Sequence, residues 1–427
     1  MRIAVIGAGI VGVTTAYELS ADGHEVIVYE RHASVAAQTS YANAGVLAPG
    51  YVTPWAAPGM PWKVISQLFG RHAPVRFAGP SALRQLPWMW QWWRACRRPV
   101  HLANRSAMQR LAHFSRERQA GLTRLLSLDF ERSSGYMVLL RTARETAMAQ
   151  GGLSLLRELE VAHELVDAHR AREIEPALNA ATPLHAAIHL AQDGAGNCRQ
   201  FAHLMKAEAQ RLGAEFRFEH AVQRIIPGAR PQLVLSLERA HGDTLFEPPS
   251  PFDAIVVCAG QDAPQLLAPL KLKLPIAPVW GYSVTAPLRR LDALHETAPK
   301  SAVMDERYKV AITRMGQRVR VAGSAEIGGT ATVFNDAALR TLYRVLDDWF
   351  PGAAQMSQAQ IWKGARPMLP DGPPILGASP VPGVWLNVGH GASGWALSCG
   401  SARIVADLLA QRTPAIDLAR LDLSRLR

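Results

Sequence analysis

The chain has 427 residues, of which 48% are hydrophobic and 19% are charged, and its formal net charge is +11 at pH 7. This length is sufficient for two folding units, and the composition excludes a disordered protein. The charge raises nucleic acid, an anionic lipid surface or an acidic small molecule as partners. No stretch is apolar for long enough to span a membrane. A strand-like segment begins at residue 2, so we expect a cytoplasmic protein without a signal peptide.

The four cysteines, Cys96, Cys198, Cys258 and Cys399, lie far apart in the sequence. None has a second cysteine or a histidine at metal-ligand spacing, which excludes a zinc motif and a disulfide framework. We therefore expect four reduced, buried thiols and no bound metal ion.

The first thirty residues have the pattern of a strand, a glycine-rich turn, a helix and a second strand. RIAVI and EVIVYE are rich in β-branched residues, and VTTAYELS between them has apolar residues at helical spacing. Gly7, Gly9 and Gly12 form GxGxxG, which permits a tight turn, close approach of a pyrophosphate and close packing of the helix. Glu30 ends the second strand, where its carboxylate can accept hydrogen bonds from ribose hydroxyls. The pattern predicts a site for NAD or FAD formed by Gly7, Gly9, Ile10, Val11, Gly12, Glu30 and Arg31.

The segment LPWMWQWWRACRRP, residues 86–99, has four tryptophans within six residues and is followed by arginines. As a helix it places the tryptophans on one broad face and the basic side chains on the opposite stripe. A buried helix, a lid over a pocket and a membrane-binding surface all fit this pattern. Because tryptophan beside arginine suits the headgroup region of an anionic bilayer, we predict peripheral attachment to the cytoplasmic face of an inner membrane through residues 54–69 and 86–98.

The middle of the chain alternates strand-like and helical segments. MVLLRT and the run 273–323 are predicted strands, FAHLMKAEAQRL is a helix that ends at Gly213, and DAIVVCAG is a strand. NDAALRTLYRVLDDWF is a helix capped by Asn335 or Asp336. Near the end of the chain, NVGHGASGW combines a strand, a second glycine-rich turn and a helix start that can face an anion. A second glycine turn this far downstream favours an extended FAD, contacted at both ends, over NAD.

Several segments together resemble the glycine oxidase and D-amino acid oxidase superfamily of flavoproteins, and in particular its D-amino acid dehydrogenase branch. They are the N-terminal unit, QTSYANAGVLAPGY (38–51), APVWGYSVT (277–285), YKVAITR (308–314), WKGARPMLPDGPPILG (362–377) and LNVGHGASGWALSCGSAR (386–403). The resemblance covers nearly the full length and implies FAD as the cofactor.

The resemblance also assigns further cofactor contacts. In that family the segment after residue 38 lines the pyrophosphate and the flavin, the position of Val222 lies against adenine, and the C-terminal helix start faces the flavin pyrimidine. We interpret His390 as a packing neighbour of the cofactor and not as a base. The implied contacts are Ser40, Asn43, Ala44, Gly45, Val222, Ala259, Gly260, His390, Gly391, Ala392, Ser393, Gly394 and Trp395.

Two residues are implied to bind the substrate. Arg366 in GARPMLPDG matches the carboxylate-binding arginine of the family, and a planar guanidinium can bind both carboxylate oxygens at once. Tyr308 matches a tyrosine that hydrogen-bonds the same carboxylate. Trp280 and Tyr282 are weaker candidates for the pocket.

The implied fold combines α/β and α+β parts: a discontinuous Rossmann-like FAD-binding domain and an antiparallel-sheet substrate domain of the D-amino acid oxidase type. We place residues 1–85, 150–265 and 355–427 in the first and residues 86–149 and 266–354 in the second.

The implied activity is oxidative deamination of D-amino acids to 2-oxo acids and ammonia, with electrons passing to a quinone or another acceptor. A cyclic D-imino acid such as a D-proline type remains an alternative substrate. A nucleic-acid-modifying flavoenzyme of the same fold is a second alternative, but the basic residues are dispersed and no RNA-binding module is evident, so we expect no nucleic acid partner. A binding protein with a vestigial nucleotide fold is a third, and the intact glycine turns count against it.

Overall fold

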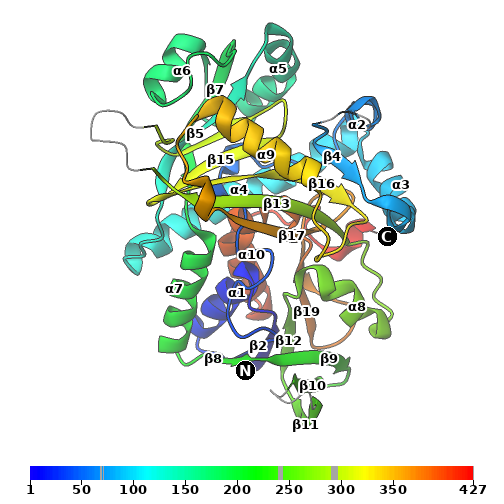
Figure 1. The fold of residues 1–427 in the computed structure, drawn as a ribbon. Helices are drawn as coiled ribbons and strands as arrows, with labels where there is room; N and C mark the ends of the chain where they lie inside the picture. The colour runs from blue at the N-terminus through cyan, green and yellow to red at the C-terminus, as the bar shows by residue number, and fades with distance from the viewer. Residues whose placement is uncertain (68–69, 71, 239–243, 290–296, 427) are drawn as a thin grey trace.

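The computed structural model describes residues 1–67, 70, 72–238, 244–289 and 297–426. These residues form two large sheets and one small sheet, with helices packed on their outer faces (Figure 1). Each large sheet is assembled from segments that are distant in the sequence. The predicted combination of α/β and α+β parts, discontinuous along the chain, is thereby confirmed.

The first large sheet has, among the described residues, six strands in the order β18-β19-β12-β1-β2-β8. All neighbours are parallel except β18 and β19. Its inner strands are continuous apolar runs because both faces of the sheet are covered. The strands are β1 (Arg2–Ile6), β2 (Glu25–Glu30), β8 (Glu215–Phe218), β12 (Ala254–Val257), β18 (Ile375–Ala378) and β19 (Val384–Val388).

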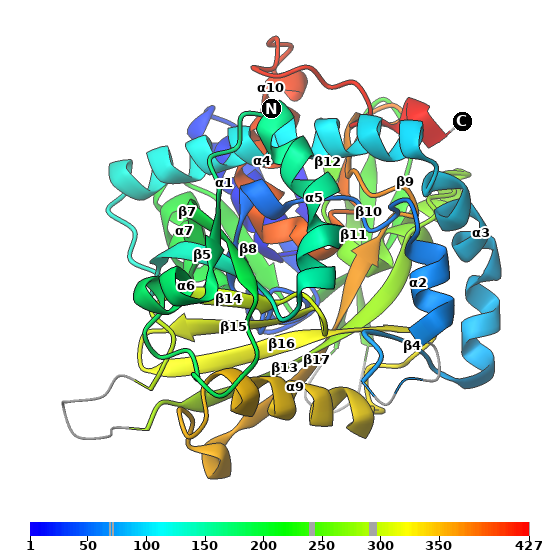
Figure 2. The ribbon, with the colours of Figure 1, turned by 90° about the horizontal axis from the view of Figure 1, so that it is seen from above.

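Four helices cover one face of this sheet: α1 (Ile10–Ala21), α4 (Arg98–Leu125), α7 (Cys198–Arg211) and α10 (Gly394–Leu409). Helix α1 packs against α7 and α10, and α4 crosses α10 (Figure 2). The opposite face packs against α8 (Ala263–Leu267) and a small antiparallel sheet. That sheet consists of β9 (His220–Ile226), β10 (Gln232–Glu238) and β11 (Thr244–Pro251).

The second large sheet has ten strands among the described residues, in the order β17-β13-β16-β15-β14-β5-β7-β3, with β4 beside β16 and β6 beside β7. Helix α9 (Asp336–Trp349) packs on one face, and the side chain of its N-cap Asn335 accepts a hydrogen bond from the Ala338 N–H, as predicted. Helices α5 (Ala143–Glu158) and α6 (Ala168–Ile174) lie at the far end of the sheet (Figure 1). The strands are β3 (Val46–Leu47), β4 (Val75–Phe77), β5 (Ser133–Leu140), β6 (Glu164–Asp167), β7 (Ala186–Ala195), β13 (Ala277–Pro287), β14 (Ala302–Asp305), β15 (Val310–Met315), β16 (Arg318–Ile327) and β17 (Gln360–Met368).

The two sheets divide the chain differently from the boundaries expected from the sequence. Strands β3, β4, β6, β7 and β17 fall within the ranges assigned to the FAD-binding domain, yet they belong to the second sheet. Helix α4 lies within 86–149, assigned to the substrate domain, yet it packs in the core of the first sheet. The expected ranges differ from the observed sheets because strands pair with segments far apart in the chain, and local sequence patterns do not encode such pairing.

The tryptophan-rich segment forms α3 (Leu86–Ala95), next to α2 (Met60–Gln67) at one edge of the molecule (Figures 1 and 2). Trp88 and Trp92 are buried against Trp55, with ring centroids 6.0 and 5.4 Å apart. Trp90 and Trp93 are 57% and 50% exposed. The helix therefore divides the broad aromatic face expected from the sequence into a core half and a surface half. Leu68 and Phe69 of the predicted membrane-binding segment lie outside the described residues.

Candidate active site

A cavity of about 870 Å³ lies where the two large sheets meet. Residues at or just beyond the ends of β1, β2, β12 and β19 line one side of it, and β13, β15, β16 and β17 line the other. Its volume is at the upper end of the range of about 300–1,000 Å³ typical of ligand pockets, as expected of a site for a cofactor and a substrate together. With the exception of Gly12, every cofactor residue expected from the sequence lines this cavity.

The turn between β1 and α1 has the geometry that its glycines predict. Gly7 has φ = +98°, a conformation that side chains disfavour. A Cβ on Gly12 would lie 1.8 Å from the carbonyl oxygen of Gly7, so Gly12 permits α1 to pack on the turn and does not itself face the cavity. The Ile10 N–H donates to Ser40 Oγ at 3.1 Å, which places the Ser40 hydroxyl at the positive end of α1. This end of the cavity is suited to a pyrophosphate.

Glu30 is fixed by the backbone beside this turn. Its Oε2 accepts from the Ala8 N–H at 2.7 Å and its Oε1 from the His32 N–H at 3.0 Å. Ionised carboxylate oxygens have further lone pairs, so both can still accept from ribose hydroxyls. Arg31 also borders the cavity, but its guanidinium forms an ion pair with Asp262 at 2.7 Å, on the partly exposed edge.

The segment from Ser40 to Gly45 is tied to the second sheet. Thr313 Oγ1 on β15 donates to the carbonyl oxygen of Ala44 at 2.7 Å, and Arg320 Nη1 on β16 donates to that of Asn43 at 2.9 Å. The Asn43 side chain in turn accepts from the Gly45 N–H at 3.1 Å. These bonds hold the segment as a fixed wall between the two sheets.

The second glycine turn leads through Gly391–Ser393 into α10, and no side chain caps the first N–H groups of the helix. The Trp395 indole N–H is buried and has no acceptor among the described residues, so it is free for a ligand. His390 Nε2 lies 3.0 Å from Ser401 Oγ, and burial lowers the pKa of His390 to about 3. Such an imidazole is too weak a base to take a proton near neutral pH, which agrees with its interpretation as a packing residue.

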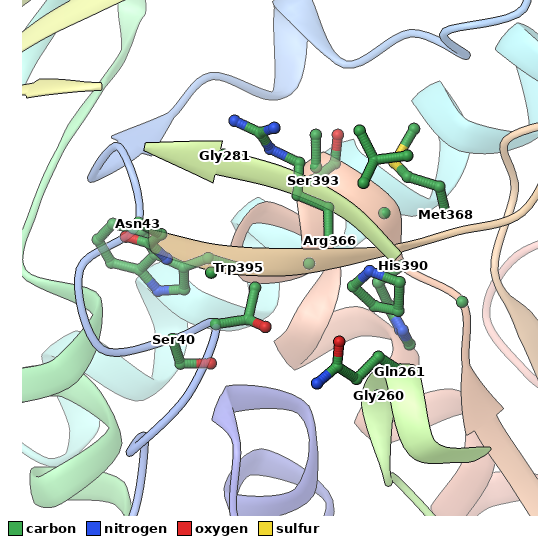
Figure 3. Close-up of a pocket in the computed structure, with 18 of the residues that line it drawn as sticks. Ser40, Asn43, Gly260, Gln261, Gly281, Arg366, Met368, His390, Ser393 and Trp395 are labelled. Atoms are coloured by element: carbon green, nitrogen blue, oxygen red, sulfur yellow. The ribbon is translucent and has the colours of Figure 1, made fainter. Parts of the chain in front are cut away.

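Arg366 projects from β17 across β13 into the cavity. In Figure 3 its guanidinium lies above the Ser40 hydroxyl in the view, and both residues line the cavity. The side chain passes over Gly281, where a Cβ would lie 2.3 Å from Nη2, so this path requires glycine. Nη1 donates to the carbonyl oxygen of Ser324 at 2.8 Å, and no described carboxylate pairs with the guanidinium. Burial lowers the pKa of Arg366 to about 10, which leaves it charged at neutral pH and available to an anion.

Tyr308 does not reach the cavity, which corrects the expectation that it binds the substrate carboxylate. Its ring lies under the guanidinium groups of Arg141 and Arg344, at 5.2 and 5.7 Å, and packs in the core beneath α9. Of the two weaker candidates, Tyr282 does line the cavity, where its hydroxyl donates to Glu326 Oε2 at 2.5 Å, whereas Trp280 does not line it.

The cavity has further polar side chains that the sequence analysis does not assign to it. A recognisable signal exists for Arg105, because it lies on the face of α4 that buries His101 and Met108. A charged residue on a buried helix face is unusual and points to a function. The additional residues include Tyr51, Lys63, Arg105, Tyr136 and Lys309.

All four cysteines are buried and unbridged, as expected. Cys399 lies within α10 and does not border the cavity, and burial raises the pKa of its thiol to about 12. Within the part of the chain that the structure describes, no group of three or more His, Cys, Asp or Glu side chains is arranged to bind a metal ion.

Comparison with known proteins places this geometry in a family. Residues 2–408 match the family model described as FAD dependent oxidoreductase. Two curated relatives, both called D-amino acid dehydrogenase and found in two strains of Cereibacter sphaeroides, are 41% identical over 428 residues, covering 100% of this chain and 95% of each relative.

Solved structures share the fold over the same extent. Glycine oxidase from Geobacillus kaustophilus matches with a TM-score of 0.74 at 22% identity, over 99% of this chain and 98% of that one. Iminodiacetate oxidase from Chelativorans sp. BNC1 matches with a TM-score of 0.72 at 22% identity, over the same shares of the two chains.

Proposed function

The chain belongs to the family of FAD-dependent oxidoreductases, and on that premise we propose that it oxidises D-amino acids. The product is an imino acid, which water converts to a 2-oxo acid and ammonia. The observation that carries the proposal is the position of Arg366, whose guanidinium faces the cavity that the FAD-binding segments line. The full-length relatives called D-amino acid dehydrogenase support this substrate class.

The protein's own contribution is to hold and orient the reactants. FAD, when bound, supplies the acceptor for the hydride that leaves the substrate Cα. Arg366 binds both oxygens of the substrate carboxylate and so fixes the direction of the Cα–H bond. The uncapped start of α10 directs N–H groups into the same cavity, which favours an electron-rich group there. A substrate with a neutral amine needs no protein base, in agreement with the weak basicity of His390.

The cofactor residues are part of the proposal. The α1 turn and Ser40 hold the pyrophosphate, Glu30 accepts from the ribose, Val222 lies against adenine, and the α10 turn faces the flavin. The proposed FAD contacts are Gly7, Gly9, Ile10, Val11, Glu30, Arg31, Ser40, Asn43, Ala44, Gly45, Val222, Ala259, Gly260, His390, Gly391, Ala392, Ser393, Gly394 and Trp395.

Anaerobic reduction of the bound flavin tests the activity directly. We expect the purified yellow protein to lose its visible absorbance on addition of D-alanine and to regain it with a quinone or a redox dye. L-alanine is the matched control and leaves the spectrum unchanged. Bleaching by D-proline but by no primary D-amino acid would assign the cyclic imino acid alternative, and the absence of bleaching by any D-amino acid would refute the proposal.

We also propose that a membrane-dissolved quinone accepts the electrons and that an anionic bilayer docks at α2 and α3. Trp62 and Ile65 on α2 are 76% and 59% exposed, beside the exposed Trp90 and Trp93 of α3. The other side of α2, at Lys63, lines the cavity, so the docked surface lies next to the site. Exposed arginines at positions 84, 94, 97 and 98 complement anionic headgroups. Among the described residues, no helix has the length and apolarity to cross a membrane, so this contact would be peripheral.

Sedimentation with anionic vesicles tests the docking. Wild-type protein should pellet with the vesicles at low salt, and Trp90→Ser and Trp93→Ser should weaken binding, with further loss as the salt concentration rises. Leu125→Ser is the control, because Leu125 is 74% exposed at the end of α4 and away from this surface. Folded wild-type protein that stays in the supernatant would refute the docking surface.

A further inference from the structure

One end of the cavity has more positive charge than the protein neutralises. Lys63 from α2, Arg105 from α4 and Lys309 at the start of β15 all line it. Lys309 pairs with Glu306, whose Oε2 also accepts from the Tyr51 hydroxyl at 2.7 Å. Lys63 and Arg105 form no hydrogen bond or ion pair with any described side chain. At longer range Lys63 interacts with Glu306 and Glu145, which already pair with Lys309 and Arg307, so neither Lys63 nor Arg105 has a carboxylate of its own among the described residues.

These unpaired groups are not on the open surface. Burial lowers the pKa of both Lys63 and Arg105, which reflects their removal from water. Arg105 Nε is a buried donor without an acceptor, and so is the hydroxyl of Tyr136, a residue only 1% exposed. Buried polar groups are normally paired, so donors left free at one point of a ligand cavity indicate that a ligand completes them.

This part of the cavity shares a wall with the Arg366 site. Arg366 donates to Ser324 on β16, and β16 pairs with β15, which Lys309 precedes. A Cβ on the neighbouring Gly323 would lie 2.9 Å from the carbonyl oxygen of Lys309. A single extended ligand on this wall can therefore face Arg366 at one end and the Lys63 and Arg105 groups at the other.

We infer that Lys63, Arg105 and the Tyr136 hydroxyl form a second anion subsite, and that the preferred substrates are D-amino acids with a second carboxylate. This inference rests on the proposed function. Arg366 binds the carboxylate next to the reacting carbon, and the second subsite binds the carboxylate at the end of the substrate side chain. The pair of subsites fixes the substrate at both ends.

Turnover of substrates matched in length tests the subsite in the FAD-loaded enzyme. D-glutamate and D-norvaline have five carbons each and differ in the terminal carboxylate. We expect kcat/KM to be about tenfold or more higher for D-glutamate, and Arg105→Met or Lys63→Met to remove most of that difference with little change for D-norvaline. Arg124→Met is the control, because Arg124 is exposed on the same helix, outside the cavity.

Binding without turnover gives an independent measurement. Glutarate should perturb the visible spectrum of the bound flavin at concentrations about tenfold or more below those of pentanoate, and Arg105→Met should abolish the difference. Equal affinity for glutarate and pentanoate, or equal loss of D-glutamate and D-norvaline turnover in Arg105→Met, would overturn the second subsite. If glutarate and pentanoate bind equally but D-norvaline is still turned over, the second subsite fails and the proposed function stands. If no D-amino acid reduces the flavin, the proposed function fails, whereas glutarate binding still reports on the subsite.

Discussion

Replacing Arg366 with lysine keeps the positive charge but removes the planar group that can bind two carboxylate oxygens. Nη1 of Arg366 already donates to Ser324, so the remaining N–H groups are those available to a substrate. A lysine ammonium offers the substrate carboxylate one strong hydrogen bond in place of two. A hydrogen bond to a charged group contributes about 1.5–3 kcal/mol, which corresponds to a loss of about 10-fold to 150-fold in kcat/KM for D-alanine.

The assay is stopped-flow reduction of the flavin over a range of D-alanine concentrations without oxygen. The visible spectrum and FAD content of the Arg366→Lys variant should equal those of the wild type, because the guanidinium hydrogen-bonds Ser324 of the second sheet and none of the proposed FAD contacts. Arg318→Lys is the control, since Arg318 pairs with Glu131 outside the cavity. A value of kcat/KM for Arg366→Lys within about twofold of the wild type would refute the assignment of Arg366 to the substrate carboxylate.

Three further predictions concern the cofactor site. Glu30→Ala should raise the Kd for FAD about tenfold or more, because the ribose loses its acceptor and the Ala8 N–H loses its partner. Titration of the apoprotein with FAD measures the Kd. An unchanged Kd would contradict the role of Glu30. Acid precipitation should release all of the yellow colour into the supernatant, because the Cys399 thiol is buried, stays protonated and does not border the cavity; colour retained in the pellet would indicate a covalent link. Burial lowers the pKa of His390 to about 3. Between that value and pH of about 6.5, the unfolded chain binds a proton at this residue and the folded chain does not. His390 therefore makes the free energy of unfolding fall by up to about 1.4 kcal/mol for each unit by which the pH decreases. Urea unfolding at pH 7.5 and 5.0 should show a smaller pH dependence for His390→Gln than for the wild type, and equal dependence would contradict the neutral state of His390.

Features that depend on contiguous residues are predictable from this sequence. The strand, turn and helix around Gly7 need only local patterns, and the same holds for the cap at Asn335. Motif spacing predicts that Gly7, Gly9 and Glu30 border the ligand, and the family resemblance predicts the same of later positions such as Ser40 and Val222; all five line the cavity. Even Gly12 has the packing role that its motif assigns, although it does not line the cavity.

The features that escaped prediction depend on which of two buried faces a side chain occupies. Helix α9 covers one face of the second sheet, and the other face borders the cofactor cavity. Apolar side chains along a strand therefore point alternately to both faces. Tyr308 and Val310 face α9, whereas Lys309 and Ala311 face the cavity, and nothing in the alternation distinguishes these two directions. The same ambiguity applies to the pairing of β7 with β5 and of β6 with β7, which places these two strands in the second sheet.

The interleaved order of the strands has a consequence for how the protein is made. The first sheet begins at residue 2, but its edge strand β18, the adjacent strand β19 and the helix start at Gly394 follow only from Ile375 onward. During synthesis, β1, β2 and β12 therefore emerge before β19, and the edge of β12 that pairs with β19 stays open until β19 is made. Non-local pairing of this kind is slow and exposes chains to aggregation. A chain that stops before β18 would retain the whole N-terminal motif but would lack the turn before α10, which lines the cavity.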